Sequence, residues 1–188
     1  MANRFTNVIG FDDSPFDKHR DRRVLVVGAV YSDSRLVGVL SAYITPDGSE
    51  ATATVQRMIQ RSRFAGQAQA ILLQGIAMAG FNVIDIHALH DALGIPVLTI
   101  ARHAPDMQAI RQALFTRVEN GPAKWRLISK AGPMEAMGHI FVQRAGLSFD
   151  DAQRIVNRFA VNGHIPEPLR TAHLIAGGIG RGESRGRT

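Results

Sequence analysis

Two adjacent carboxylates, Asp12 and Asp13, follow a short apolar run near the N-terminus, and their position suggests chemistry. The run, residues 8–11, is typical of the first buried strand of an α/β sheet. Because side chains alternate along a strand, one carboxylate should face a site and the other should point away. Carboxylate oxygens on a rigid strand end suit a hard divalent cation, Mg²⁺ or Mn²⁺. Asp-Asp-Ser-Pro is also ordinary turn sequence, so a solvated turn remains an alternative.

The elements that would position these carboxylates follow from the hydrophobic pattern. We expect strands at residues 8–11, 24–30, 36–44, 70–73 and 96–100, and helices at 50–63, 81–93, 106–114, 148–159 and 167–176. Hairpin-linked strands followed by strands alternating with helices predict a mixed sheet with flanking helices. This order resembles ribonuclease H-like folds, whose active carboxylates lie on the adjacent first and fourth strands. We expect a single α/β domain over residues 1–178 and a basic glycine- and arginine-rich tail over 179–188, with residues 115–146 unassigned.

Composition narrows the class of protein. The chain has 188 residues, 45% of them hydrophobic, no cysteine and a net charge of +6, which fits one globular domain without disulfides or thiolate metal sites. Residues 124–188 carry ten basic and five acidic side chains. Since arginine binds phosphate with a planar fork, the arginine-rich composition favours nucleic acid as a partner, although codon usage also enriches arginine. With no apolar run of about 18–20 residues and no secretion signal before the first strand, we expect a cytoplasmic protein that does not cross a membrane.

Four sequence blocks carry a family resemblance. Residues 10–16, 47–52, 74–85 and 166–173, the last running on to 182–187, resemble the endonuclease dU family, which itself resembles endonuclease V. The resemblance implies a metal-dependent DNA repair endonuclease that uses Mg²⁺ or Mn²⁺ and nicks DNA near a deaminated base, deoxyuridine. Such chemistry is physically reasonable, because carboxylate-bound cations activate water and stabilise the leaving oxygen of a phosphodiester.

The resemblance also implies which residues form the site. Asp12 matches the metal ligand on the first strand, and Glu50 lies near the second acidic ligand, with Asp47 as the competing choice. His173 resembles a histidine that orders water or protonates a leaving group, so Asp12, Glu50 and His173 form the expected catalytic set. The expected substrate-binding residues are Arg102 at the scissile phosphate, together with Asp13, Asp85, Arg170 and, in the tail, Arg185, although a structural contact of Asp85 with the neighbouring loop is an alternative. Tyr43, beside the expected metal loop, is a candidate to stack on an extruded base because aromatic side chains do so, with core packing as the alternative.

One position departs from the family pattern. Gln74 ends the fourth strand where the resembled families usually have a metal-binding aspartate. An amide oxygen can still ligate a cation but brings no charge, so metal binding should be weak. A second hypothesis is therefore a nucleic-acid-binding relative with little or no nuclease activity. A third is an α/β domain that binds small nucleotides through the glycine-containing loop after residue 74.

Overall fold

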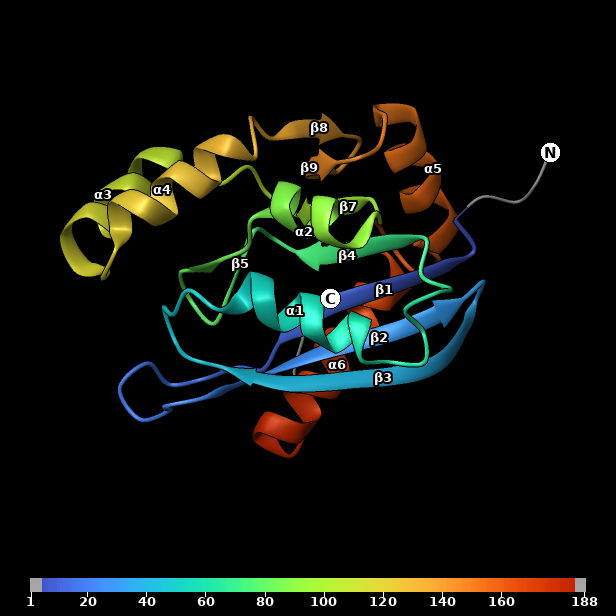
Figure 1. The fold of residues 1–188 in the computed structure, drawn as a ribbon, viewed down its shortest axis with the longest axis horizontal. Coiled ribbons are helices and arrows are strands. Elements are labelled where there is room, and N and C mark those ends of the chain that lie inside the picture. The colour runs from blue at the N-terminus through green and yellow to red at the C-terminus, as the bar shows by residue number, and fades with distance from the viewer. Residues whose placement is uncertain (1–4, 185–188) are drawn as a thin grey trace.

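The structure is a computed structural model that describes residues 5–184. Its centre is a seven-stranded sheet in the order β3-β2-β1-β4-β7-β9-β8 (Figure 1). β1 pairs in parallel with β4 and β4 with β7, whereas the other neighbours are antiparallel. The strands are β1 (Asn7–Asp13), β2 (Val24–Ser32), β3 (Arg35–Ile44), β4 (Ala70–Gln74), β7 (Val97–Ala101), β8 (Glu135–Met137) and β9 (Ile140–Ala145). This mixed sheet confirms the expected fold class and the adjacency of the first and fourth strands.

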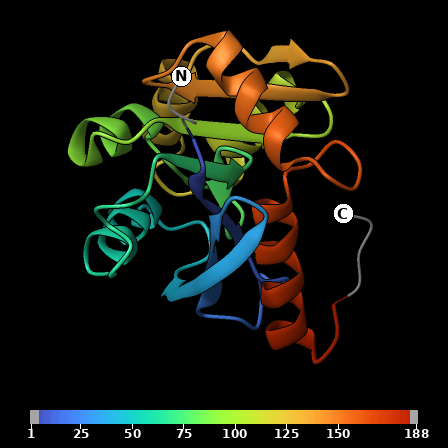
Figure 2. The ribbon, with the colours of Figure 1, turned by 90° about the vertical axis from the view of Figure 1, so that its right-hand side faces the viewer.

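Helices cover both faces of the sheet (Figures 1 and 2). One apolar cluster joins the sheet to α5 (Phe149–Phe159) and α6 (Glu167–Arg181). A second, on the opposite face, joins it to α1 (Ala51–Gln60) and α2 (Ile86–Leu93). Because β1 and β4 are covered on both sides, their apolar runs are continuous. The remaining elements are α3 (Met107–Arg117), α4 (Gly121–Lys130) and a small hairpin of β5 (Ala77–Met78) and β6 (Asn82–Val83).

The glycine in β1 allows α6 to pack directly on that strand. A Cβ atom at Gly10 would lie 2.4 Å from the carbonyl carbon of Pro168. The next turn of α6 is fixed to β2, where the hydroxyls of Tyr31 and Thr171 are 2.7 Å apart. These contacts determine where the side chains that follow in α6 reach the end of β1.

Several expected boundaries were wrong. The helix expected from residue 81 begins only at Ile86, because Asp85 caps it by accepting a hydrogen bond from the Ala88 N–H. Asn82 lies in β6, and its side chain accepts from the Ala51 N–H at the start of α1 (2.9 Å). α6 continues to Arg181 rather than 176, and so enters the region expected as tail. The unassigned stretch contains α4, β8 and β9.

Within residues 5–184, no helix is both long and apolar enough to cross a membrane.

Candidate active site

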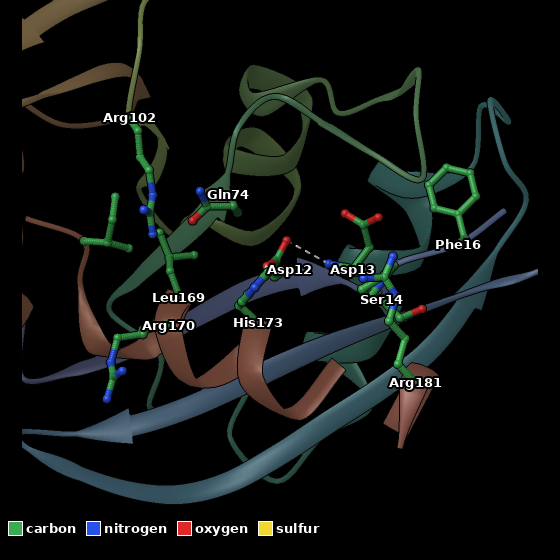
Figure 3. A pocket seen from close by; sticks show the side chains of 12 residues that line it. Asp12, Asp13, Ser14, Phe16, Gln74, Arg102, Leu169, Arg170, His173 and Arg181 are labelled. Atoms are coloured by element: carbon green, nitrogen blue, oxygen red, sulfur yellow. Dashed lines mark hydrogen bonds and ion pairs between the residues drawn. The ribbon is translucent and has the colours of Figure 1, made fainter. Parts of the chain in front are cut away.

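Asp12 lies at the end of β1 and is paired with a histidine from α6. The Asp12 side chain is only 8% exposed, and its Oδ2 is 2.8 Å from Nδ1 of His173. Its Oδ1 accepts a hydrogen bond from the Asp13 N–H (2.9 Å) (Figure 3). The hydrogen bond to Asp12 raises the pKa of His173, although burial of the ring opposes this. The hydrogen bond therefore holds the His173 imidazole against the buried Asp12 carboxylate and brings together two residues of the expected catalytic set.

Asp13 contacts the opposite side of the strand end. Its Oδ2 accepts a hydrogen bond from the Ala79 N–H of the hairpin loop (3.1 Å). Burial, and then the negative charge of Asp12, raise the pKa of Asp13 to about 6. The expected alternation is present, since the two carboxylates bond to different elements. Both nevertheless border the same cavity, because the strand ends there.

The cavity at this strand end has a volume of about 440 Å³ and joins elements distant in sequence. Gln74 enters it from the end of β4, and Arg102 from the residue after β7 (Figure 3). Four residues of α6 complete the polar and apolar wall: Leu169, Arg170, His173 and Arg181. The carboxylates thus lie among basic side chains that approach from two sides.

The arginines around the cavity differ in their partners. Arg170 pairs with Glu167 in the same helix (Nε to Oε2, 3.0 Å). Within residues 5–184, no ion pair or hydrogen bond engages the guanidinium groups of Arg102 and Arg181. Unpaired guanidinium groups beside carboxylates are suited to an anion such as phosphate. Arg181 was not among the residues predicted from the sequence. Its signal was the spacing of eight residues from His173, which places both on one helix face once α6 is known to extend so far.

Glu50 takes part in a local structural network. Its carboxylate accepts hydrogen bonds from the Thr45 N–H (2.6 Å), the Ser49 N–H (2.9 Å) and the Asn82 amide (3.1 Å). Burial acts to raise the pKa of Glu50, but these hydrogen bonds outweigh it and lower the pKa to about 2. Glu50 is not among the described residues that line the cavity. The structure therefore does not bring it to Asp12.

Asp47 is bound in the same loop. Its Oδ1 accepts from the Phe81 N–H (2.7 Å), and its Oδ2 is 2.6 Å from Nζ of Lys18. The buried Lys124 ammonium donates to its backbone carbonyl. Like Glu50, Asp47 is absent from the described residues around the cavity. Both side chains fix the segment between β3 and α1 to its neighbours.

The other expected substrate residues lie away from this cavity or outside the described chain. Tyr43 is 52% exposed on β3, with the Arg23 guanidinium 5.0 Å from its ring centre. Asp85 caps α2 and pairs with Lys130 (2.8 Å). Arg185 lies outside the described residues.

The oxygen atoms at the strand ends are of the type that a hard divalent cation prefers, but they carry few negative charges. Asp12 and Asp13 offer carboxylate oxygens, and Gln74 offers an amide oxygen, all of which suit Mg²⁺ or Mn²⁺. The raised pKa of Asp13 indicates that its negative charge is poorly compensated. Among the residues that the structure describes, no group of three or more acidic or histidine side chains is arranged to hold a metal ion. A cation here would depend on two carboxylates, one amide and water.

Comparison with known proteins identifies the family. A family model described as endonuclease dU matches residues 4–180. The chain belongs to the endonuclease dU family. A relative from Deinococcus radiodurans, named a UPF0215 protein, is 47% identical over 97% of this chain and 93% of its own. Another UPF0215 protein, from Methanothermobacter thermautotrophicus, is 40% identical over 95% of this chain and 90% of its own.

Solved structures support the fold of this endonuclease dU member. A protein of unknown function from Archaeoglobus fulgidus has a TM-score of 0.86 and 36% identity, covering 92% of this chain and 97% of that one. Human ENDOV has a TM-score of 0.58 at 16% identity, with 91% and 82% covered. Ciona intestinalis endonuclease V, solved with inosine-containing DNA, has a TM-score of 0.57 at 17% identity, with 89% and 82% covered. At these low identities the likeness to endonuclease V concerns the ribonuclease H-like fold.

Proposed function

We propose that this protein is a metal-dependent DNA endonuclease that nicks beside a deaminated base, with deoxyuridine as the lesion. The observation that carries the proposal is the Asp12–His173 pair in a cavity shared with Asp13, Gln74 and two arginines that have no partner in the described part of the chain. Family membership supports nuclease activity and deoxyuridine. DNA as the partner is supported by the DNA complex of endonuclease V, which has a similar fold.

The residues of the cavity divide the chemistry between them. A bound divalent cation supplies positive charge to the phosphodiester and lowers the pKa of water. Asp12 and Asp13 provide the anionic oxygens that would hold it, together with the amide oxygen of Gln74. The Asp12 hydrogen bond orients the His173 ring, which can hold or release a proton through its other nitrogen, Nε2. Arg102 and Arg181 are positioned to bind phosphate oxygens of the strand.

The proposal is tested with labelled oligonucleotides that carry one deoxyuridine, in duplex and single-stranded form, with Mg²⁺ or Mn²⁺. Deoxyinosine and undamaged strands serve as substrate controls. We expect lesion-dependent nicking that is lost with a chelator and lost in Asp12→Ala. Asp91→Ala is the matched control, because Asp91 is an exposed aspartate on α2 that does not line the cavity. Nicking that persists in Asp12→Ala would contradict the assigned site.

A second candidate function is favoured by the neutral side chain of Gln74. If the wild-type protein binds lesion-containing DNA without nicking it, and Gln74→Asp nicks, the protein is a binding relative and the nuclease proposal is wrong. If neither the wild type nor Gln74→Asp nicks DNA, the nuclease proposal is also wrong.

A further inference from the structure

A second, apolar cavity adjoins the candidate active site. Its volume is about 340 Å³, and its walls come from the ends of β4 and β7 and from α3 and α4. Gln74 and Arg102 line the first cavity, whereas their chain neighbours Gly75 and Ala101 line the second. Because β4 and β7 are paired neighbours, the two cavities lie on either side of one pair of strand ends. A nucleotide at the first cavity could therefore reach the second with its base.

The apolar cavity contains one buried amide with unused hydrogen-bonding capacity. Gln143, on β9, is 4% exposed, and its Nε2 donates to the Gly132 carbonyl (2.6 Å). Since that partner is an acceptor, the amide nitrogen must face it, which fixes the orientation of the amide. No hydrogen bond from any described residue reaches its Oε1. One N–H and the carbonyl oxygen thus have no partner among the described residues and are available to a ligand. No fully buried side-chain polar atom of residues 5–184 lacks a partner, so the free oxygen of this amide is accessible from the cavity that Gln143 lines.

The other walls suit a flat ring. Ile76, Met107, Ile110 and Ile128 supply apolar surface. At about 30 Å³ for each water-sized group, the cavity holds about 11 such groups, enough for a pyrimidine or purine. Apolar walls with a single oriented polar group are typical of small-molecule sites, and nucleobases are extruded into such pockets by enzymes that act on damaged DNA.

We propose that this cavity receives the extruded base and that Gln143 is the residue that recognises its edge, by pairing with adjacent N–H and C=O groups. The ligand class is a lactam base, which includes uracil and hypoxanthine. This inference rests on the proposed function, and it assigns recognition to Gln143 rather than to the exposed Tyr43.

The test measures binding with a chelator present, so that neither metal nor cleavage is required. Fluorescence anisotropy compares single strands that carry deoxyuridine, N3-methyldeoxyuridine or an abasic analogue. We expect the wild type to bind deoxyuridine about tenfold more tightly than the other two, which corresponds to one or two hydrogen bonds. Gln143→Met keeps the side-chain volume but removes the amide, and it should bind all three strands alike.

Two further variants make the test decisive. Gln153→Met is the matched control, because Gln153 is exposed on α5 and lines a different cavity, so it should retain the wild-type preference. Ile110→Trp fills the proposed cavity without altering Gln143 and should also lose the preference. If folded Gln143→Met and Ile110→Trp both keep it, the inference is wrong, even if the protein nicks DNA. If the wild type does not nick but shows the preference and these variants lose it, recognition stands and only the nuclease proposal fails.

Discussion

Gln74 determines how much negative charge faces a cation at the end of β4. It lines the cavity beside Asp12 and Asp13, but its amide is neutral. We predict that Gln74→Asp binds Mg²⁺ at least about tenfold more tightly than the wild type, because an added carboxylate contributes several kcal/mol of attraction at short range, part of which is lost to repulsion from its neighbours. Calorimetric titration measures this. Gln67→Asp, in an exposed loop, is the control and should leave the affinity unchanged; equal affinity in all three proteins would contradict a role for residue 74.

The ionisation of the Glu50 carboxylate makes the stability of the fold depend on pH. Its pKa in the folded protein is about 2, below the ordinary value of 4.5, so its ionised form stabilises the fold above about pH 4.5, and this contribution is lost as the pH falls toward 2. We predict that Glu50→Gln lowers the free energy of unfolding at pH 7 by about 1–2 kcal/mol, since charge-assisted hydrogen bonds are weakened. Urea unfolding at pH 7, 4.5 and 3 should show the difference shrinking with acidity. A loss of nicking without any loss of stability would instead favour the ligand role implied by the family resemblance.

At the scale of elements, the contact between β1 and α6 aligns the two halves of the site. Asp12 comes from β1 and His173 from α6. The two elements approach so closely at Gly10 that no larger side chain fits between the strand and the helix. We predict that Gly10→Ala lowers the free energy of unfolding by about 1–3 kcal/mol, the usual cost of overpacking, and that nicking falls further than stability explains, because α6 is displaced. Gly66→Ala, where an added Cβ meets nothing within 4 Å, is the control. Unfolding curves and nicking rates that match the wild type in Gly10→Ala would show that α6 can shift without consequence.

The parts of the fold that could be predicted from the sequence are those set within one element, and the parts that could not are contacts between distant elements. The apolar runs of β1 and β4 were sufficient to expect two buried strands with Asp12 at the end of the first, because that signal is local. Their adjacency was expected only from the resemblance of the element order to ribonuclease H-like folds. Asn82 was expected within the helix at 81–93, whereas its side chain bonds to Ala51 at the start of α1, a partner 31 residues away that only the fold brings near. The hydrogen bond between Glu50 and the Asn82 amide could not be predicted for the same reason. Arg181 was missed because the two glycines at 177 and 178 have low helix propensity and suggest an earlier helix end. In the structure, α6 continues through both of them to Arg181.

At the scale of the whole molecule, the net charge of +6 and the two arginines without a partner among residues 5–184, Arg102 and Arg181, predict a strongly salt-dependent affinity for DNA. Binding that neutralises phosphates releases counterions, so the logarithm of the association constant should fall linearly with the logarithm of salt concentration, with a slope of about −0.9 for each phosphate contacted in a duplex. Arg102→Gln and Arg181→Gln should each reduce the magnitude of that slope by about 1.

The matched control for these arginines is Arg154→Gln. Arg154 pairs with Asp151 on α5 and does not line the cavity, so its removal should leave the slope unchanged. The measurement is anisotropy of a labelled duplex titrated at several salt concentrations with a chelator present. A steep slope that falls equally in all three variants would mean that DNA is held by diffuse positive charge. A shallow slope in the wild type would instead favour a small nucleotide as the ligand, because such a ligand engages too few phosphates to release many counterions.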